Sequence, residues 1–329
     1  MIMKCKKCFL YLFVFLLLLF ESQVFCNSSK INFQLSPEIG FLNGTIVENV
    51  WYADISKNNN ITYKPTSRMS RLDWQFDNSL FIGMNSNLII NDKLIFGFQF
   101  KNAISHKCGM MEDYDWLNPI TDAWQNDPKN ELTNYSIHTN SLNYFRLFDF
   151  LIGWKFFLNE YKSISITPFF GIQIQKNSFD GLNGWGTYKK YNWAKQYFDN
   201  EKVISYSQSY AAPELCLNFD FDYFQYFEFL LDVSTIWIPD LNCIDIHHHG
   251  NERFYNDRIK NAWNFNTELT VLFKITKNNK FGIKGGISYI PDAYGLTYSS
   301  TTSTIPDSST LGGTSRFLYT YSFIYTFYF

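Results

Sequence analysis

Two short segments of this chain carry acidic and imidazole side chains at spacings that could support acid–base chemistry. Asp113 and Asp115 are separated by one residue, and so are Asp245 and His247. In an extended backbone, residues i and i+2 share a face, so each pair would present its two side chains together. An aspartate beside a histidine orients the ring and stabilises its protonated form, and such a pair could deprotonate a water held by the opposing carboxylates.

Other interpretations of these residues stay open. An Asp-x-Asp pair in a surface loop is more often a solvated segment or a casual cation site than a catalytic pair. Cys243 with His247, His248 and His249 could bind zinc, because Cys and His are its usual ligands. Adjacent residues of a strand point in opposite directions, so the three histidines could reach one metal only across a sharp turn. The sequence has no serine nucleophile elbow, no Walker loop and no HExxH motif.

Strands are the elements that must position these pairs, because apolar and polar residues alternate with period two in many segments. Every odd position from 317 to 329 is aromatic, which predicts a continuous aromatic strip on one face of a strand. In other segments the opposite face carries charge, as at Glu228, Asp232, Glu268 and Lys284. A water-soluble sandwich would place the charged face outside, whereas a membrane barrel inverts this arrangement. Periodicity alone does not choose between the two.

The N-terminus and the composition favour the membrane version. Three lysines before residue 8, an apolar run over 9–20 and a more polar stretch after it are typical of a secretory signal peptide, which we expect to span residues 1–26. Lipid modification of Cys26 is an alternative to cleavage after it. Residues 27–329 are expected to form one domain. Aromatic residues make up 20% of the 329 residues, as suits the lipid-facing surface and interfacial girdles of a barrel.

We predict an all-β fold, a ten-stranded antiparallel transmembrane β-barrel with long extracellular loops. The expected strands lie at about 32–52, 68–89, 93–104, 141–157, 162–176, 206–221, 224–238, 262–275, 280–291 and 315–329. Long connections alternate with tight turns between them, and this asymmetry of the two rims is typical of outer-membrane barrels. The long connections 105–140 and 239–261 hold the two pairs.

Other features bound the function. No apolar run after Cys26 approaches the roughly 18 residues of a spanning helix, and the net charge of −2 offers no bulk attraction to nucleic acid. After the signal region Cys108, Cys216 and Cys243 remain. An odd count does not make a disulfide framework, so one bond at most is expected.

In these residues the chain resembles the omptin family of outer-membrane aspartate/histidine proteases. The resemblance rests on the order of several short motifs: Leu42, Asn43 and Gly44 followed by Glu48; the segment 70–78; Met111 to Trp116 followed by Asn118 and Pro119; Ser178 and Phe179 followed by Tyr188; and Asp245 to His247. Each motif is short, and only their ordered combination, spread over nearly the whole mature chain, is specific.

The resemblance implies an endopeptidase at the cell surface that needs neither a metal nor any other cofactor. Asp113, Asp115, Asp245 and His247 would be catalytic, with Asp113 and His247 activating a water. Glu48 and Met111 would bind the substrate, and cleavage would occur beside or between basic residues of the substrate. The expected partners are peptide or protein substrates and outer-membrane lipid, including lipopolysaccharide, and the protein is expected to be a monomer.

The chain departs from the family pattern at the substrate pocket. Cys243 stands where the family has a second acid, and Asp240 is a possible substitute. Asp122 and Asp127 both compete for the acid of the neighbouring subsite. On the exterior we find no convincing basic cluster for lipopolysaccharide, although Arg146 falls in the apolar phase of its strand.

Two other functions compete with the peptidase. A barrel of the same descent could act without catalysis, as a surface adhesin or receptor. A porin-like channel is the third hypothesis, and ten strands argue against it because small barrels fill their interior with side chains.

Overall fold

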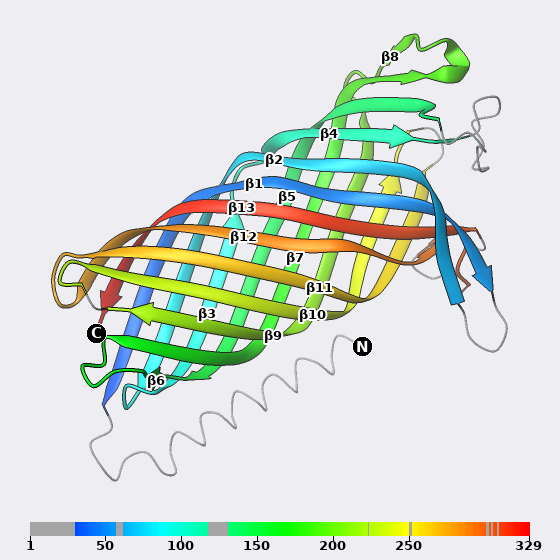
Figure 1. The fold of residues 1–329 in the computed structure, drawn as a ribbon. Helices are drawn as coiled ribbons and strands as arrows, with labels where there is room; N and C mark the ends of the chain where they lie inside the picture. Colours follow the sequence, from blue (N-terminus) through cyan, green and yellow to red (C-terminus); the bar gives the residue numbers. More distant parts are fainter. Residues whose placement is uncertain are drawn as a thin grey trace.

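The computed structural model describes residues 30–56, 62–117, 131–222, 224–249, 252–300, 303, 305–307 and 309–329. Nearly all of them lie in antiparallel strands (Figure 1). The strands are β1 (Ile31–Ser56), β2 (Thr62–Ile90), β3 (Leu94–Ala103), β4 (Lys107–Asp115), β5 (Asn134–Trp154), β6 (Phe156–Phe157), β7 (Ile164–Tyr188), β8 (Lys195–Tyr197), β9 (Lys202–Phe221), β10 (Phe227–His247), β11 (Arg253–Lys274), β12 (Asn279–Tyr298) and β13 (Thr310–Tyr328). A single 3-10 turn, Lys189–Tyr191, follows β7.

These strands occupy ten positions in a closed wall. β3 and β4 both pair with β2 and with β5, so they are two parts of one wall strand that is interrupted at residues 104–106. β6 continues β5, and β8 pairs with β7 alone. β1 pairs with β13 and closes the ring. The prediction of a ten-stranded antiparallel barrel is confirmed.

The ring closes through the aromatic end of the chain. The backbone N–H of Phe33 donates to the carbonyl of Phe329 at 3.2 Å, and the N–H of Phe329 donates back to Phe33 at 2.9 Å. The predicted aromatic strip of β13 faces outward, because Phe317, Tyr319, Tyr321 and Phe323 are all exposed. β1 and β13 are therefore paired so that the aromatic strip of β13 lies on the outer face.

The predicted loops are largely strand. β1 continues to Ser56, and β2 begins at Thr62. β4 lies within the expected loop 105–140. β10 continues to His247, and β11 begins at Arg253. The prediction was wrong here for a physical reason. On β10 and β11 the inward facing reverses at residues 239–240 and 260–261, so the simple alternation breaks there while the backbone ladder continues. The catalytic candidates consequently lie on strands.

The outer face of the lower barrel carries a belt of exposed large apolar residues. On β10 to β13 the belt ends upward at Trp237, Trp263, Tyr289 and Phe317, as expected for an aromatic girdle at a membrane interface. Within the described residues, no helix is long and apolar enough to cross a membrane. The charged faces point inward, so the alternation is that of a membrane barrel.

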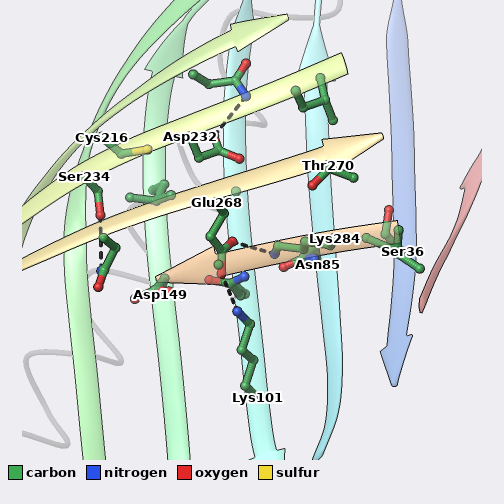
Figure 2. Close-up of a pocket in the computed structure, with 18 of the residues that line it drawn as sticks. Ser36, Asn85, Lys101, Asp149, Cys216, Asp232, Ser234, Glu268, Thr270 and Lys284 are labelled. Carbon is green, nitrogen blue, oxygen red and sulfur yellow. Dashed lines mark hydrogen bonds and ion pairs between the residues drawn. The ribbon is translucent and has the colours of Figure 1, made fainter. Parts of the chain in front are cut away.

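Inside the belt the barrel interior is polar and ion-paired. Glu268 lies between Lys101 and Lys284 (Figure 2), with Lys284 Nζ 2.5 Å from its carboxylate. Lys284 also lies 3.6 Å from Glu38, which accepts a hydrogen bond from Ser322. Lys101, Glu268 and Lys284 line a cavity of about 420 Å³.

Above this cavity the interior is apolar. Trp74, Phe179, Ile236 and Ile238 are completely or almost completely buried and belong to one core cluster with residues from most of the wall strands. Side chains therefore close the barrel above the cavity, in keeping with ten strands, and this packing argues against the channel hypothesis.

Candidate functional site

The first acidic pair lies on β4, above the apolar core. β4 is held between β2 and β5, and Asp113 is paired with Leu72 on one side and Ser136 on the other. Ser70 Oγ donates to Asp113 Oδ1 at 3.4 Å. Asn134 Nδ2 donates to Asp115 Oδ2 at 3.3 Å. Each carboxylate therefore has a neutral donor from a neighbouring strand.

The second pair lies at the upper end of β10. His247 Nε2 is 2.7 Å from Asp245 Oδ2, and Asp245 is only 5% exposed. The ring of Tyr255, from β11, meets the His247 ring edge-on, with 5.6 Å between centroids. The imidazole is thus fixed by one hydrogen bond and one aromatic contact, while its side chain remains 37% exposed.

β4 and β10 face each other across the barrel. In the closed ring, β5, β7 and β9 separate them on one side, and β11, β12, β13, β1 and β2 separate them on the other. The charges of Asp113 and Asp115 nevertheless act on the His247 ring. The fold thus brings all four sequence-predicted catalytic candidates into one electrostatic environment.

This environment changes the protonation of the site, which lies above the girdle and outside the membrane-spanning segments. Burial alone would lower the pKa of His247, but Asp245, Asp113 and Asp115 together raise the pKa to about 9. Burial and the neighbouring Asp115 raise the pKa of Asp113 well above its usual range, although the charge on His247 opposes this. The neighbouring carboxylates therefore favour the protonated form of His247 near neutral pH.

The predicted substrate-binding residues lie beside this site. Glu48, on β1, is 1% exposed, and Trp74 Nε1 donates to its carboxylate at 3.5 Å. Met111, on β4, is also 1% exposed, and its methyl group packs against Gly181, where a Cβ would be 2.8 Å away.

The proposed second pocket acid is not Asp240. This residue is exposed, whereas Cys243 is 1% exposed on the inward face of β10. The two candidates for the neighbouring subsite, Asp122 and Asp127, lie outside the described residues, as do Asn118 and Pro119.

The histidine run does not converge on one point. Whereas His247 contacts Asp245, His248 Nε2 is 2.8 Å from Ser205 Oγ, and His249 Nδ1 is 3.0 Å from Glu201. Among the residues that the structure describes, no group of three or more His, Cys, Asp or Glu side chains could hold a metal ion. Cys108, Cys216 and Cys243 are each free and buried.

Sequence reasoning missed four neighbours of the site: Ser70, Asn134, Tyr255 and Asp257. Ser70 and Asn134 are found only from the pairing of β4 with β2 and β5. Tyr255 and Asp257 are found from the β10–β11 hairpin, where they pair with Asp245 and Cys243. If β10 and β11 had been predicted to extend to residues 247 and 253, pairing them outward from the connection would have identified both residues.

The closed ladder, the outward apolar belt and the acid–imidazole site above it define an outer-membrane β-barrel with a hydrolase-like centre at one rim. Residues 29–325 match the model of the Omptin family, so the chain belongs to the omptin family. This membership places the protein in the outer membrane.

Individual relatives agree with the family match. Protease 7 of Escherichia coli strain K12 is 22% identical over 277 residues, which are 81% of this chain and 80% of that protein. The plasminogen activator of Yersinia pestis is 23% identical over 198 residues, or 60% of this chain and 57% of that protein. The crystal structure of outer membrane protease OmpT from Escherichia coli superposes with a TM-score of 0.75 at 19% identity, covering 94% of this chain and 99% of that one. The last comparison shows the shared fold.

Proposed function

We propose that this protein is an endopeptidase that cleaves peptides or proteins at the outer surface of the cell. The observation that carries the proposal is the hydrogen-bonded pair of Asp245 and His247 on one wall, whose imidazole also interacts electrostatically with Asp113 and Asp115 on the opposite wall. The related proteins named as a protease and as a plasminogen activator support a peptidase over a passive barrel. The His247 side chain is 37% exposed, so water can reach it.

Each of the four residues has a role in the proposed mechanism. Asp245 accepts the hydrogen bond from His247 Nε2, which leaves Nδ1 as the ring nitrogen that takes a proton from water. Asp113, supported by Ser70, and Asp115 hold that water from the opposite wall. The hydroxide attacks the peptide carbonyl, and protonated His247 then donates its proton to the departing amine. No covalent enzyme intermediate is formed.

Substitution of the acid–base residues tests this mechanism. We expect His247→Ala and Asp113→Ala to reduce kcat on a fluorogenic peptide library by about 10²-fold to 10⁴-fold, the range of general acid–base catalysis. Cleavage by the unaltered protein should continue in the presence of chelators and of serine-protease inhibitors. His249→Ala is the matched control, because this exposed ring contacts Glu201 rather than Asp245.

Heat-modified mobility in gels and circular dichroism would show that each variant is a folded barrel. A folded, unaltered barrel that cleaves no peptide in the library would contradict the enzyme and favour the adhesin or receptor. Cleavage that survives both substitutions would reject the assigned residues.

The preference for basic residues is also proposed, and it rests on the buried carboxylate of Glu48. The lipid requirement is proposed from the family resemblance. Arg146 is exposed on the outer face and lies over the Tyr144 ring, 5.4 Å from its centroid, where a lipopolysaccharide phosphate could reach it.

A further inference from the structure

A buried acid on β11 lies directly opposite the anomalous Cys243. Asp257 is 3% exposed and is paired with Cys243 across the β10–β11 ladder. Residues paired in an antiparallel ladder present their side chains to the same face. Asp257 therefore enters the interior at the level where the family pattern would place the missing acid.

Along β11 the residues that face inward change from even-numbered to odd-numbered, and this change brings Asp257 inside. Below the membrane girdle, even-numbered residues of β11 face inward, as buried Asn264 and Ala262 show. Over residues 257–260, odd-numbered residues do so, because Ile259 and Asp257 are buried while Arg258 and Lys260 are exposed. Asn261 has a left-handed backbone (φ 59°), which marks the reversal. Without it, Asp257 would point outward.

A glycine two strands away from Asp257 leaves room for its carboxylate. Its carboxyl carbon lies 1.8 Å from where a Cβ would stand at Gly312, so only glycine fits there. Gly312 is on β13, and β12 lies between β13 and β11. Gly312 pairs with Val50, and its neighbour Thr314 pairs with Glu48. The Asp257 carboxylate thus reaches over β12 toward the strand pair that carries Glu48.

Glu48 and Asp257 are two buried acids without a cation. None of the ion pairs within 4 Å that the described residues form includes either of them. Burial, and then the charges of Asp245 and Asp257, raise the pKa of Glu48 well above its usual range. Burial raises the pKa of Asp257 to about 7, against a hydrogen bond from Thr297 Oγ1 at 2.7 Å. A positive charge delivered between them would relieve both their desolvation and their repulsion.

Aromatic rings lie beside Glu48 and Cys243. Trp74 stacks on Tyr206 with 5.8 Å between centroids, and Trp74 also donates to Glu48. Tyr206 in turn is an electrostatic neighbour of both Glu48 and Cys243. Such rings suit the methylene stem and the cationic head of a long side chain.

We infer that Asp257 replaces the acid missing at Cys243, and that Asp257 and Glu48 together select a substrate with a cationic side chain next to the cleaved bond. This inference rests on the proposed endopeptidase activity and adds a specificity-determining residue to it.

Two matched peptides test the inference on the full-length barrel: one with a single lysine among alanines, and one with norleucine in its place. We expect Asp257→Asn to lower kcat/KM for the lysine peptide by about tenfold or more, because it removes one partner of a buried charge pair. Cleavage of the norleucine peptide should stay within about twofold, since its side chain carries no charge to lose. Asp240→Asn, which alters an exposed acid on the adjacent strand, should leave both rates unchanged.

A second variant separates charge from folding. Adding Cys243→Asp to Asp257→Asn returns an acid to the same level one strand away, and we expect it to restore the lysine preference. Equal losses on both peptides, or no loss on either, would overturn the role of Asp257, and so would failure of the double variant to recover.

Binding distinguishes this inference from the catalytic proposal. If the unaltered protein cleaves neither these two peptides nor any peptide of the library, the endopeptidase proposal fails. Binding of the two peptides is then measured by quenching of tryptophan fluorescence, since Trp74 lies beside Glu48. Tighter binding of the lysine peptide that disappears in Asp257→Asn supports the inference, and equal binding of the two peptides overturns it.

Discussion

His247 differs from an isolated imidazole because three carboxylates surround it. Asp245 makes the hydrogen bond, while Asp113 and Asp115 add their charge from the opposite wall. At neutral pH the ring therefore holds a proton, and the neutral form that can accept one from water becomes abundant only as the pH approaches 9. We expect the pH dependence of cleavage to report this balance.

Asp245→Asn tests the balance. Asp245 carries the largest charge that raises the pKa of His247, so its removal should lower that pKa. The acidic limb of kcat/KM should then move to lower pH by about one to three units, as for loss of a neighbouring charge. The plateau rate should fall, because asparagine orients the ring less well. A pH–rate profile of both proteins measures the two effects, and an acidic limb that does not move would show that another group controls it.

At the scale of the elements, the reversal of facing in β10 and β11 determines the site. In lower β10, Glu228 and Ser234 are buried and face inward, as alternation predicts. Extending that phase would place Asp245 and His247 outside the barrel. The structure turns the phase at Pro239 and Asp240, next to Lys260 and Asn261, so that Leu241, Cys243 and Asp245 are buried.

This reversal explains what could be predicted from the sequence. The strands of the membrane belt and the two Asp-containing pairs follow from alternation and spacing, because lipid and interior differ sharply in polarity. The upper strands, the inward position of Asp257 and the contacts of Ser70 and Tyr255 do not follow. They depend on a local backbone turn and on strand register, which the composition of a single segment does not encode.

Asn261 is the residue in which the reversal can be tested. Asn261→Gly should preserve both stability and the lysine preference, since glycine accepts a left-handed backbone. Asn261→Val should destabilise the barrel by about 1–2 kcal/mol, the cost of this conformation for a residue with a branched side chain. Urea unfolding in lipid vesicles measures the difference. If valine costs nothing, the backbone at 261 is not strained and the assigned cause of the reversal is wrong.

At the scale of the whole molecule, ionic pairing and apolar packing divide the interior into two levels. Below, Lys101, Glu268, Lys284 and Glu38 form a connected set beside the cavity. Above, the apolar core supports the catalytic rim. The lower level contributes stability and the upper level contributes the shape of the site.

Lys284→Met should test this division, because it leaves Glu268 and Glu38 buried with one cation fewer. We expect the free energy of unfolding to fall by about 3–5 kcal/mol, as when one partner of a buried ion pair is removed. The double variant Lys284→Met, Glu268→Gln should lose less than the single variant. Urea unfolding in lipid vesicles reports both values, and additive losses would mean that the two residues do not interact. Peptide cleavage by the surviving folded barrel should be nearly unchanged.

The hydrogen bonds between Phe33 and Phe329 join the two ends of the ladder, and a sheet without an edge has no place from which to peel. Unfolding must therefore open an entire seam between two strands at once. Because of this barrier, the time for which the barrel stays folded depends on its unfolding rate rather than on its equilibrium free energy of unfolding. A protease exposed to the medium, and to other proteases in it, would persist because it opens slowly, even where its net stability is modest.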